Sequence, residues 1–460
     1  MFNEFCGRVE ELDVSSNQIG ELEGIPHTVR LLNVRGNCLS DLAAWESLQN
    51  LQYLDVSSNQ LGSLKGFQCL VHLRALKAEN NEIESLDGLE GLDGLTSLSL
   101  KSNELRTVDF ENFDLRRLAH MDLRDNELTK VSNFHRLTAL ETCDFSCNDL
   151  DALDFTISVP LFKLQYLNIS NNRLSFIDLA ELPNLKSLNL DKNSIASIES
   201  LSSLKHLETL SWREQTLISA YGISEIHYQR CHEVRNLYLS GNSLSTFAPP
   251  TPFLNLHHLE LASTGLQTFA SDLGMKCPNL RTLNINYNAI RDLRPLLGIV
   301  KLEKLFMAGN RISRLRRTVS VLQHLSKALV EVDMRNNPLT VGFYTPQEPV
   351  REERCVALQR HKHTEGDDED LEASKIEAYL LPPLDKEQDN TSRERLDEDT
   401  KVRRRVHELM IVHTCRRLER LDGLGVDRRI LKKNSGVWKR LHELGVLKEK
   451  SITERDDCNE

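Results

Sequence analysis

The sequence predicts an α/β solenoid made of about 15 short stacked repeats, because one pattern of residues recurs along most of the chain. The pattern reads L-x-L-x-x-N-x-L, with an aliphatic residue at each L, and it is complete at residues 54–61, 98–105 and 188–195. Its polar position returns mostly every 20 to 24 residues, which is typical of a repeat architecture. That position is occupied by Asn17, Asn37, Asn59, Asn81, Asn103, Asn126, Asn148, Asn172, Asn193, Gln215, Asn242, Thr264, Asn288, Asn310 and Asn337.

Each part of the pattern has a physical role in this fold. The L-x-L part predicts a short strand whose leucines point into the core while the residue between them faces outward. The asparagine ends the strand at a tight turn, where its amide can bond main-chain groups that the turn leaves unpaired. Gln215 and Thr264 are expected to do the same with poorer reach. Since one repeat cannot bury its own leucines, neighbours must stack, and we predict a leucine-rich-repeat solenoid with short parallel strands on its concave face.

The rhythm stops after Asn337, and the rest of the chain divides by charge. Residues 1–345 are assigned to the solenoid. Residues 346–400 hold 8 Lys/Arg against 17 Asp/Glu, which predicts an acidic and largely disordered insertion, with a possible anchor at residues 379–384. Residues 401–450 hold 15 Lys/Arg against 6 Asp/Glu and predict a C-terminal helical cap followed by a basic helix, and 451–460 form a tail.

The composition argues against several classes of function. The chain carries a formal charge of −11 and contains no apolar run long enough to span a bilayer, so neither nucleic acid nor membrane is an expected partner. The ten cysteines lack the spacing of a metal site and are expected to be reduced thiols. Because no nucleophile motif, glycine-rich phosphate loop or metal spacing occurs, we expect no enzyme activity and no cofactor.

Strand register predicts which side chains line the concave face. Four aromatic residues fall at outward strand positions, where packing of the core does not require a ring. Such rings are enriched in protein interfaces because they bury a large area at little cost in entropy. We therefore predict partner contacts at Tyr53, Tyr166, Tyr238 and Phe306, with Tyr238 and Phe306 as the stronger pair.

Three basic residues on successive repeats form a second candidate site on this face. Lys77, Lys101 and Arg124 are expected to lie within ~10 Å of one another, given the spacing of neighbouring strands. They could clamp a phosphate or an acidic peptide. The alternative is that three nearby aspartates neutralise them in a solvated network of ion pairs. These are Asp55, Asp122 and Asp144.

The end of the chain carries a resemblance to known families. Leu418, Leu421, Asp422 and Gly423 resemble the C-terminal cap of SDS-type proteins, the phosphatase-regulator class with 22-residue repeats, except that about sixty residues intervene after Asn337-Pro338-Leu339. The repeat array, the acidic insertion and the late Arg-Arg-Leu-Glu-Arg-Leu-Asp-Gly cap together resemble the C-terminal repeat domain of fungal spindle-pole-body scaffolds. These scaffolds organise the mitotic-exit or septation-initiation network and are related to animal centriolin.

The resemblance implies a mitotic role in the cytoplasm and cytoskeleton. Members of that family tether a GTPase-activating complex to the spindle pole body, help to recruit kinases, and depend on phosphorylation for several contacts. They carry a long N-terminal region ahead of the repeats, so this chain is expected to be part of a longer protein. The family has no catalytic residues to transfer.

Two other functions remain open from the sequence. A regulatory subunit that wraps a protein phosphatase would have the same repeats, but it should bind a folded surface rather than short acidic peptides. A nucleic-acid-associated repeat protein is suggested by the basic residues 401–450, and its affinity should fall steeply with salt. The acidity of residues 1–345 argues against the latter.

Overall fold

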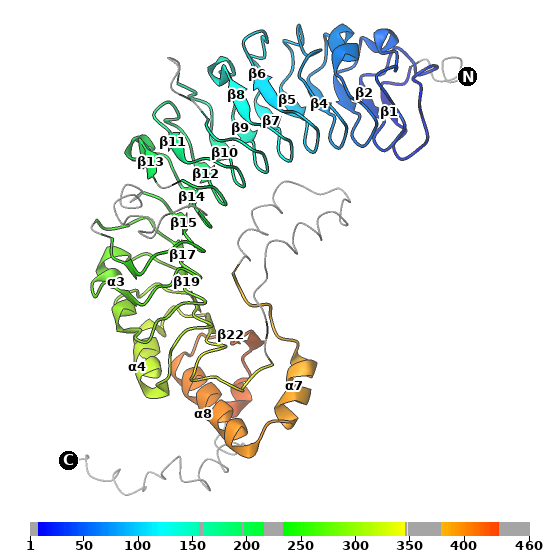
Figure 1. Cartoon of the computed structure of the whole chain (residues 1–460). Helices are drawn as coiled ribbons and strands as arrows, with labels where there is room; N and C mark the ends of the chain where they lie inside the picture. Colours follow the sequence, from blue (N-terminus) through cyan, green and yellow to red (C-terminus); the bar gives the residue numbers. More distant parts are fainter. Residues whose placement is uncertain are drawn as a thin grey trace, which may run out of the picture. The chain divides into compact units, whose positions relative to one another are not determined.

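A computed structural model of the chain divides into two compact units, Met1–Tyr238 (unit 1) and Leu239–Glu460 (unit 2). The structure describes residues 8–153, 155, 160–195, 197–215, 233–249, 251–345, 347 and 379–431 (Figure 1). Both units consist of short parallel strands joined by turns, with a helical cap at the end of unit 2. The predicted leucine-rich-repeat solenoid is confirmed.

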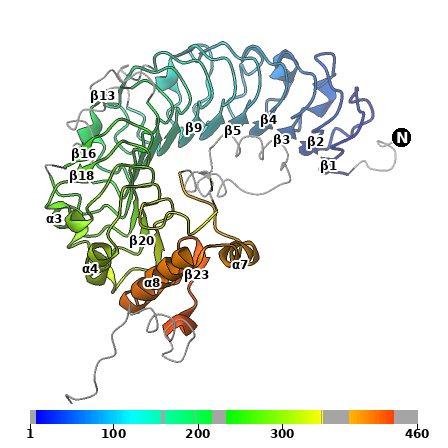
Figure 2. The same ribbon diagram turned by 60° about the horizontal axis from the view of Figure 1, so that its bottom comes forward.

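Unit 1 contains one parallel sheet on its strand face, and Figure 2 shows its strands side by side. Every strand pairs with the next repeat in the same register, so that Asp13 lies opposite Asn33 and Asn33 opposite Asp55. The strands are β1 Glu11–Asp13, β2 Leu31–Asn33, β3 Tyr53–Asp55, β4 Ala75–Lys77, β5 Ser97–Ser99, β7 His120–Asp122, β9 Thr142–Asp144, β10 Tyr166–Asn168, β12 Ser187–Asn189, β14 Thr209–Ser211 and β15 Asn236–Tyr238.

Shorter elements occupy the outer side of unit 1. The strands β6 (Thr107–Asp109) and β8 (Lys130–Ser132) form one small parallel pair, and β11 (Phe176–Asp178) and β13 (Ser197–Glu199) form another. Four 3-10 turns among the described residues also lie on this side, and two of them directly follow β8 and β13. These are η1 Glu46–Leu48, η2 Lys65–Cys69, η3 Phe134–Arg136 and η4 Leu201–Ser203.

Unit 2 continues the same design and adds more helix. Its strand face carries β17 (His258–Glu260), β19 (Thr282–Asn284), β20 (Lys304–Phe306) and β21 (Glu331–Asp333), all parallel. Its outer side holds a β16–β18 pair and two helices. The bounds of these outer elements are β16 Thr246–Phe247, β18 Thr268–Phe269, α3 Leu273–Lys276, η6 Arg294–Leu296 and α4 Leu315–Leu325.

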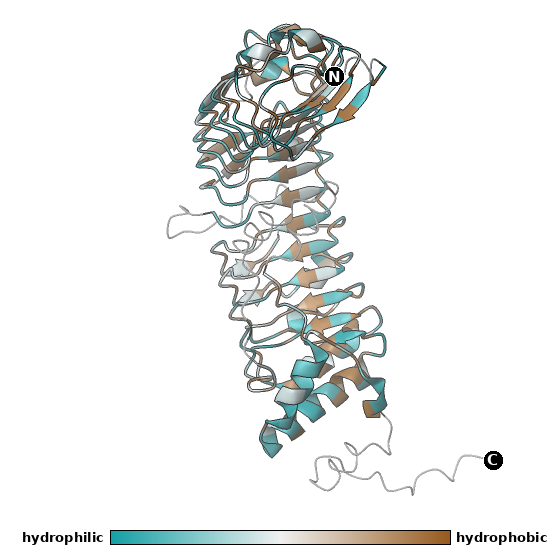
Figure 3. Cartoon of the chain, turned by 90° about the vertical axis from the view of Figure 1, so that its right-hand side faces the viewer, coloured by the Kyte–Doolittle hydropathy of each residue, from teal (hydrophilic) through white to brown (hydrophobic). Residues whose placement is uncertain are grey.

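The core follows from the leucine spacing. From β2 onward the middle residue of each three-residue strand on the strand face is buried, as Leu32, Leu98 and Leu210 illustrate, while its two neighbours face away from the core. Figure 3 shows this alternation as hydrophobic and hydrophilic colours within single strands. Trp212 occupies an inward leucine position in the repeat of β14 and is fully buried.

The asparagines predicted to bond main-chain groups at the turns do so, and they stack along the repeats as a ladder of hydrogen bonds that Asn103 illustrates. Its Oδ1 accepts from the Ile83 N–H of the preceding repeat at 3.1 Å. Its Nδ2 donates to the carbonyls of Ala78 and Leu100, both at 2.9 Å. One side chain therefore joins two repeats and satisfies main-chain groups in each.

Gln215 and Thr264, which replace asparagine in the ladder, differ from each other. Gln215 makes both bonds to the preceding repeat, since its Oε1 accepts from Ile195 N–H at 2.9 Å and its Nε2 donates to the Leu190 carbonyl at 3.0 Å. The expected poorer reach therefore does not apply to it. Thr264 has no amide, and the Leu244 N–H of the preceding repeat bonds its main-chain carbonyl instead, at 2.8 Å.

The turn before each ladder residue has a left-handed backbone. The residue in front of the ladder position has positive φ, for example Ser58 (57°), Asn80 (53°) and Ser102 (56°). Residues other than glycine adopt this conformation at some cost in energy. The ladder bonds offset that cost, because the amide holds the carbonyls just before the turn, as Asn103 holds those of Leu100 and Lys101.

The predicted helical cap closes unit 2. Helix α8 (Glu398–Thr414) leads to β22 (Arg420–Leu421), which pairs in parallel with β21 and antiparallel with β23 (Leu424–Gly425). Leu418 and Leu421, the cap leucines expected from the sequence, are buried. The cap therefore supplies a last strand and covers the leucines that the final repeat would expose.

Order extends further into the acidic segment than the charge pattern predicted. Helix α7 (Lys386–Glu394) lies within residues 346–400, and its N-cap Asp385 accepts from the main-chain N–H groups of Glu387 and Gln388. Helix α8 starts at Glu398, ahead of the expected boundary at residue 401. Disorder is also predicted for the acidic run Asp367–Asp370, which lies outside the described residues. Most of the basic helix expected after Asp427 lies outside them too, and the described part of that region contains η7 (Arg428–Leu431).

Buried polar side chains fasten the cap to the last repeat. Asp422 is fully buried and accepts from Met334 N–H at 2.7 Å, from the Tyr344 hydroxyl at 2.8 Å and from His407 Nε2 at 2.9 Å. Burial by itself would raise the pKa of Asp422, but the hydrogen bond and charge of His407 with the other two donors hold that pKa below its usual value. Asp422 therefore stays ionised in the core of the cap.

Candidate functional site

The strand face of unit 1 carries two polar columns in the predicted register. The third residue of each strand forms one column, in which Asp55, Lys77, Ser99 and Asp122 lie in succession. The second column lies two residues further on and includes Lys101 and Arg124. Both columns are positioned by the ladder turns that follow them.

The candidate basic clamp is divided between these columns. Lys77 lies in the first column and is exposed, whereas Lys101 and Arg124 lie in the second and are half-buried. Arg124 Nε is 2.9 Å from Asp122 Oδ2, so the ion-pair alternative describes Arg124. Within the part of the chain that the structure describes, Lys77 and Lys101 form no ion pair. Binding of a phosphate by the three together stays a prediction.

Acidic neighbours shape the electrostatics around Arg124. Burial raises the pKa of Asp122 to about 7, and the charges of Asp144 and Glu79 add to this while Arg124 opposes it. The carboxyl of Asp122 therefore titrates near neutral pH. This makes the local charge of the face depend on pH in the physiological range.

Replacing Asp122 by asparagine is expected to stabilise the protein at pH 8 by roughly 1 kcal/mol and to have no stabilising effect near pH 4. A carboxyl whose folded pKa is raised stabilises the folded state when protonated, and that contribution is lost as pH rises from about 4 through 7. The gain stays small because the substitution also removes the ion pair with Arg124. Urea unfolding at both pH values measures it, and a variant equally destabilised at pH 4 and 8 would contradict the assignment.

The four predicted aromatic contacts differ in exposure. Tyr53 and Tyr166, the first residues of β3 and β10, are 44 % and 47 % exposed. Phe306, the last residue of β20, is half-buried. Tyr238 differs from expectation, because it is only 9 % exposed and the Arg213 guanidinium lies 4.6 Å from its ring centroid. Partner contact stays a prediction for these positions, and exposure now favours Tyr53 and Tyr166.

In unit 2 a later segment of the chain lies on the strand face. Asn286, two residues after β19, donates to the Tyr379 carbonyl at 3.0 Å. Arg335, two residues after β21, donates to the carbonyls of Pro382 (2.8 Å) and Leu381 (3.3 Å). The possible anchor at residues 379–384 is therefore a docked segment. It occupies the side chains of Asn286 and Arg335, which could otherwise bind the main chain of a partner peptide.

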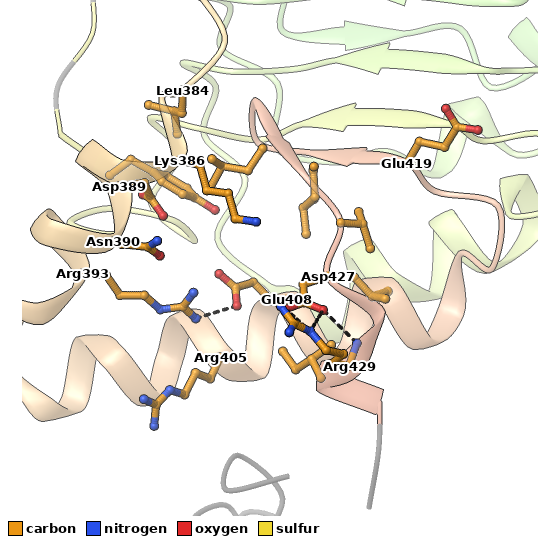
Figure 4. A pocket seen from close by; sticks show the side chains of 17 residues that line it. Leu384, Lys386, Asp389, Asn390, Arg393, Arg405, Glu408, Glu419, Asp427 and Arg429 are labelled. Atoms are coloured by element: carbon orange, nitrogen blue, oxygen red, sulfur yellow. Dashed lines mark hydrogen bonds and ion pairs between the residues drawn. The ribbon is translucent and has the colours of Figure 1, made fainter.

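The cap also contains a cavity of about 800 Å³ beside α7 and α8 (Figure 4). Its charged lining is partly paired, with Arg393 2.7 Å from Glu408 and Arg429 2.9 Å from Asp427. Leu421, Leu424 and other apolar residues line the rest.

Metal binding, membrane insertion and cysteine pairing can also be assessed from the described residues. Those residues contain no cluster of histidine, cysteine, aspartate or glutamate able to hold a metal ion. None of the helices among them is both long and apolar enough to cross a bilayer. Cys38, Cys69, Cys143, Cys147, Cys277 and Cys415 are free thiols.

Parts of the chain match known leucine-rich-repeat families. The family described as Leucine Rich repeats (2 copies) matches residues 163–203 and 278–324, and Leucine Rich repeat matches residues 47–64. Solved structures with the same fold include a leucine-rich-repeat protein of Leptospira interrogans (TM-score 0.54, 23 % identity, 72 % of this chain and 97 % of that one). The APL1 leucine-rich-repeat domain is another (TM-score 0.55, 18 % identity, 71 % and 85 %). The chain therefore has the leucine-rich-repeat fold.

Within that class, the resemblance to the repeat domain of septation scaffolds is confirmed. The chain is 34 % identical over 435 residues to the septation initiation network scaffold protein cdc11 of Schizosaccharomyces pombe, a match that covers 92 % of this chain. The chain spans 39 % of the length of that relative. The similarity of sequence supports a protein-binding scaffold.

Sequence reasoning missed one cluster of charged residues altogether. Arginines follow two successive ladder residues of unit 2, at Arg291 and Arg294 and again at Arg311, Arg314 and Arg317. They lie three and six residues after Asn288 and one, four and seven residues after Asn310, so no common offset marks them in the sequence. They are also absent from the outward strand positions, because they follow the turn.

Proposed function

We propose that the chain is a non-catalytic scaffold that anchors septation or mitotic-exit signalling proteins, including a GTPase regulator and kinases, at the spindle pole body. The observation that carries this proposal is the 34 % identity over 92 % of the chain to the S. pombe scaffold. A row of outward-facing side chains on a rigid repeat sheet supports it, since such sheets offer extended binding surfaces.

The proposed binding surface lies on unit 1. The strand face of unit 2 is partly occupied by residues 379–384, whereas β3 and β10 of unit 1 present Tyr53 and Tyr166 with nearly half of each side chain exposed. Exposed tyrosines bury much area at little entropic cost when a partner docks. A globular partner that contacts both rings would span several repeats.

A chimaera tests the localisation. This chain replaces the region of the S. pombe scaffold that it matches, and the fusion is followed by fluorescence in dividing cells. The expected result is a focus at each spindle pole and completed septation. A chimaera that is stable but diffuse throughout mitosis would argue against the proposed function.

A pair of matched variants in that chimaera tests the binding surface. The Tyr53→Ser/Tyr166→Ser double variant is expected to lower the intensity of the pole signal, or the recruitment of signalling proteins to it, by about tenfold, because two exposed anchor rings are lost. Phe176→Ser is the control, since Phe176 begins the outer strand β11 and its ring is also 52 % exposed. Equal behaviour of both variants would place the partner elsewhere on the chain.

A further inference from the structure

A second cavity, of about 1030 Å³, lies in unit 2 at the loops that follow β19 and β20. Two adjacent repeats and the first turns of α4 build it. Its basic lining consists of Arg291, Arg294, Arg311, Arg314, Arg317 and His324.

The positive charge of this cavity is largely uncompensated. Asp292, the acidic residue in its lining, forms an ion pair with Arg294, whose Nε lies 2.7 Å from Asp292 Oδ2. Within the described residues the other four arginines have no acidic partner within 4.0 Å. Other arginines of unit 2 are paired, as Arg335 is with Asp333 and Arg404 with Asp389. Guanidinium groups without an acidic partner are therefore concentrated at this site, although the chain as a whole has a net charge of −11.

The backbone holds these arginines in fixed positions. Arg311 N–H donates to the Ile290 carbonyl at 3.0 Å, and Asn310 Oδ1 accepts from Ile290 N–H at 3.1 Å, which ties the two loops together. Thr318 N–H and Thr318 Oγ1 both bond the Arg314 carbonyl at 3.1 Å. The guanidinium groups thus extend from a rigid frame around one space.

The floor of the cavity is apolar. Leu293, Ile312 and Val321 line it and are each at most 5 % exposed, and Leu297, also in the lining, is 38 % exposed. A ligand that matches this lining carries a doubly charged group for the arginines and apolar atoms beside it. An extended nucleic acid would require a basic stripe across many repeats instead.

We propose that this cavity binds a phosphorylated peptide of a partner protein, with the phosphate held by Arg291, Arg311, Arg314 and Arg317 and an apolar neighbouring side chain on Leu293 and Ile312. Guanidinium forks match phosphate oxygens in pairs, and a phosphate supplies close to two negative charges where a carboxylate supplies one. The site belongs to unit 2 and shares no residue with the unit 1 surface, so it goes beyond the scaffold function proposed above and can fail independently of it.

Binding is measured with the full chain and labelled degenerate peptides that share a fixed central residue. One pool carries phosphothreonine, a second threonine and a third glutamate at that position. The phosphothreonine pool is expected to bind, and the threonine and glutamate pools at least tenfold more weakly, because they offer fewer charge-assisted hydrogen bonds. Equal binding of the three pools, or no binding of the phosphothreonine pool, overturns the proposal.

Neighbouring arginines on α4 provide the matched variants. Arg317→Gln, within the cavity lining, is expected to weaken binding of the phosphothreonine pool about tenfold. Arg316→Gln removes the same charge from the adjacent exposed residue, which does not line the cavity, and is expected to leave affinity within about twofold. Equal losses in both variants would mean general attraction to positive charge and would overturn the site.

A membrane surface is the competing source of phosphate groups. Mixed phosphatidylcholine–phosphatidylserine vesicles are therefore tested in the same assay. Vesicle binding that Arg317→Gln abolishes, together with no binding of the phosphothreonine pool, overturns the peptide proposal in favour of a lipid surface. Both variants are exposed at the changed position, so unchanged thermal unfolding is the check that neither acts through stability.

Discussion

Replacing Asp422 by alanine is expected to lower the free energy of unfolding of unit 2 by about 3–5 kcal/mol. The change leaves the Met334 N–H, the Tyr344 hydroxyl and His407 without their common acceptor in a site that water does not reach. Buried donors that lose their partner cost their full desolvation energy. Because Asp422 joins the cap to the last repeat, the loss should appear first where β22 pairs with β21.

Hydrogen exchange and urea unfolding measure this effect. The Glu419 and Asp422 amides, which bond the carbonyls of Val330 and Val332, should exchange much faster in the variant than in the parent chain. Asp427→Ala is the control, because Asp427 is an exposed acid in the same cap, paired with Arg429 on the surface. Its expected cost is below about 1 kcal/mol. Similar losses for the two aspartates would refute the role of the buried network.

The same network predicts acid sensitivity of the cap. The folded pKa of Asp422 is held below its usual value, so its contribution to stability is present above about pH 4 and is lost as pH falls through the folded pKa. The difference between the parent chain and Asp422→Ala should therefore narrow below pH 4. A constant difference across that range would show that the carboxylate is not the stabilising species.

Replacing Asn103 by alanine is expected to cost about 2–4 kcal/mol. The change removes the acceptor for Ile83 N–H and the donor for the carbonyls of Ala78 and Leu100, all of them inside the stack. It also releases the left-handed turn at Ser102 from the bonds that hold it. Because the ladder links each repeat to the one before it, loss of the Asn103 hydrogen bonds should weaken one interface between repeats.

The first repeat offers the control for the ladder. Asn17 is exposed and bonds only the carbonyls of its own turn, those of Val14 and Ser15, within the described structure. Asn17→Ala is expected to cost below about 1 kcal/mol. Urea unfolding of both variants measures the difference, and equal costs would mean that the bonds between repeats contribute nothing.

Part of the strand-face surface could be predicted from the sequence. Period-two alternation placed Tyr53, Tyr166, Tyr238 and Phe306 at outward strand positions, and each lies at the end of a strand as expected. Exposure did not follow from that alternation. Tyr238 is nearly buried beneath Arg213, because exposure depends on what covers an outward side chain as well as on its direction.

The sequence by itself determined the repeat, the register and the ladder, because these depend on contacts between equivalent positions of adjacent repeats and so recur with the period of the chain. Only the tertiary structure decided three other features: the docking of residues 379–384 on Asn286 and Arg335, the burial of Asp422 among its three donors, and the gathering of arginines around one cavity. Residues 93 positions apart meet in the first of these, at Asn286 and Tyr379. Contacts of that kind have no period, so a pattern in the sequence cannot predict them, and they arise when the folded repeats bring distant side chains together.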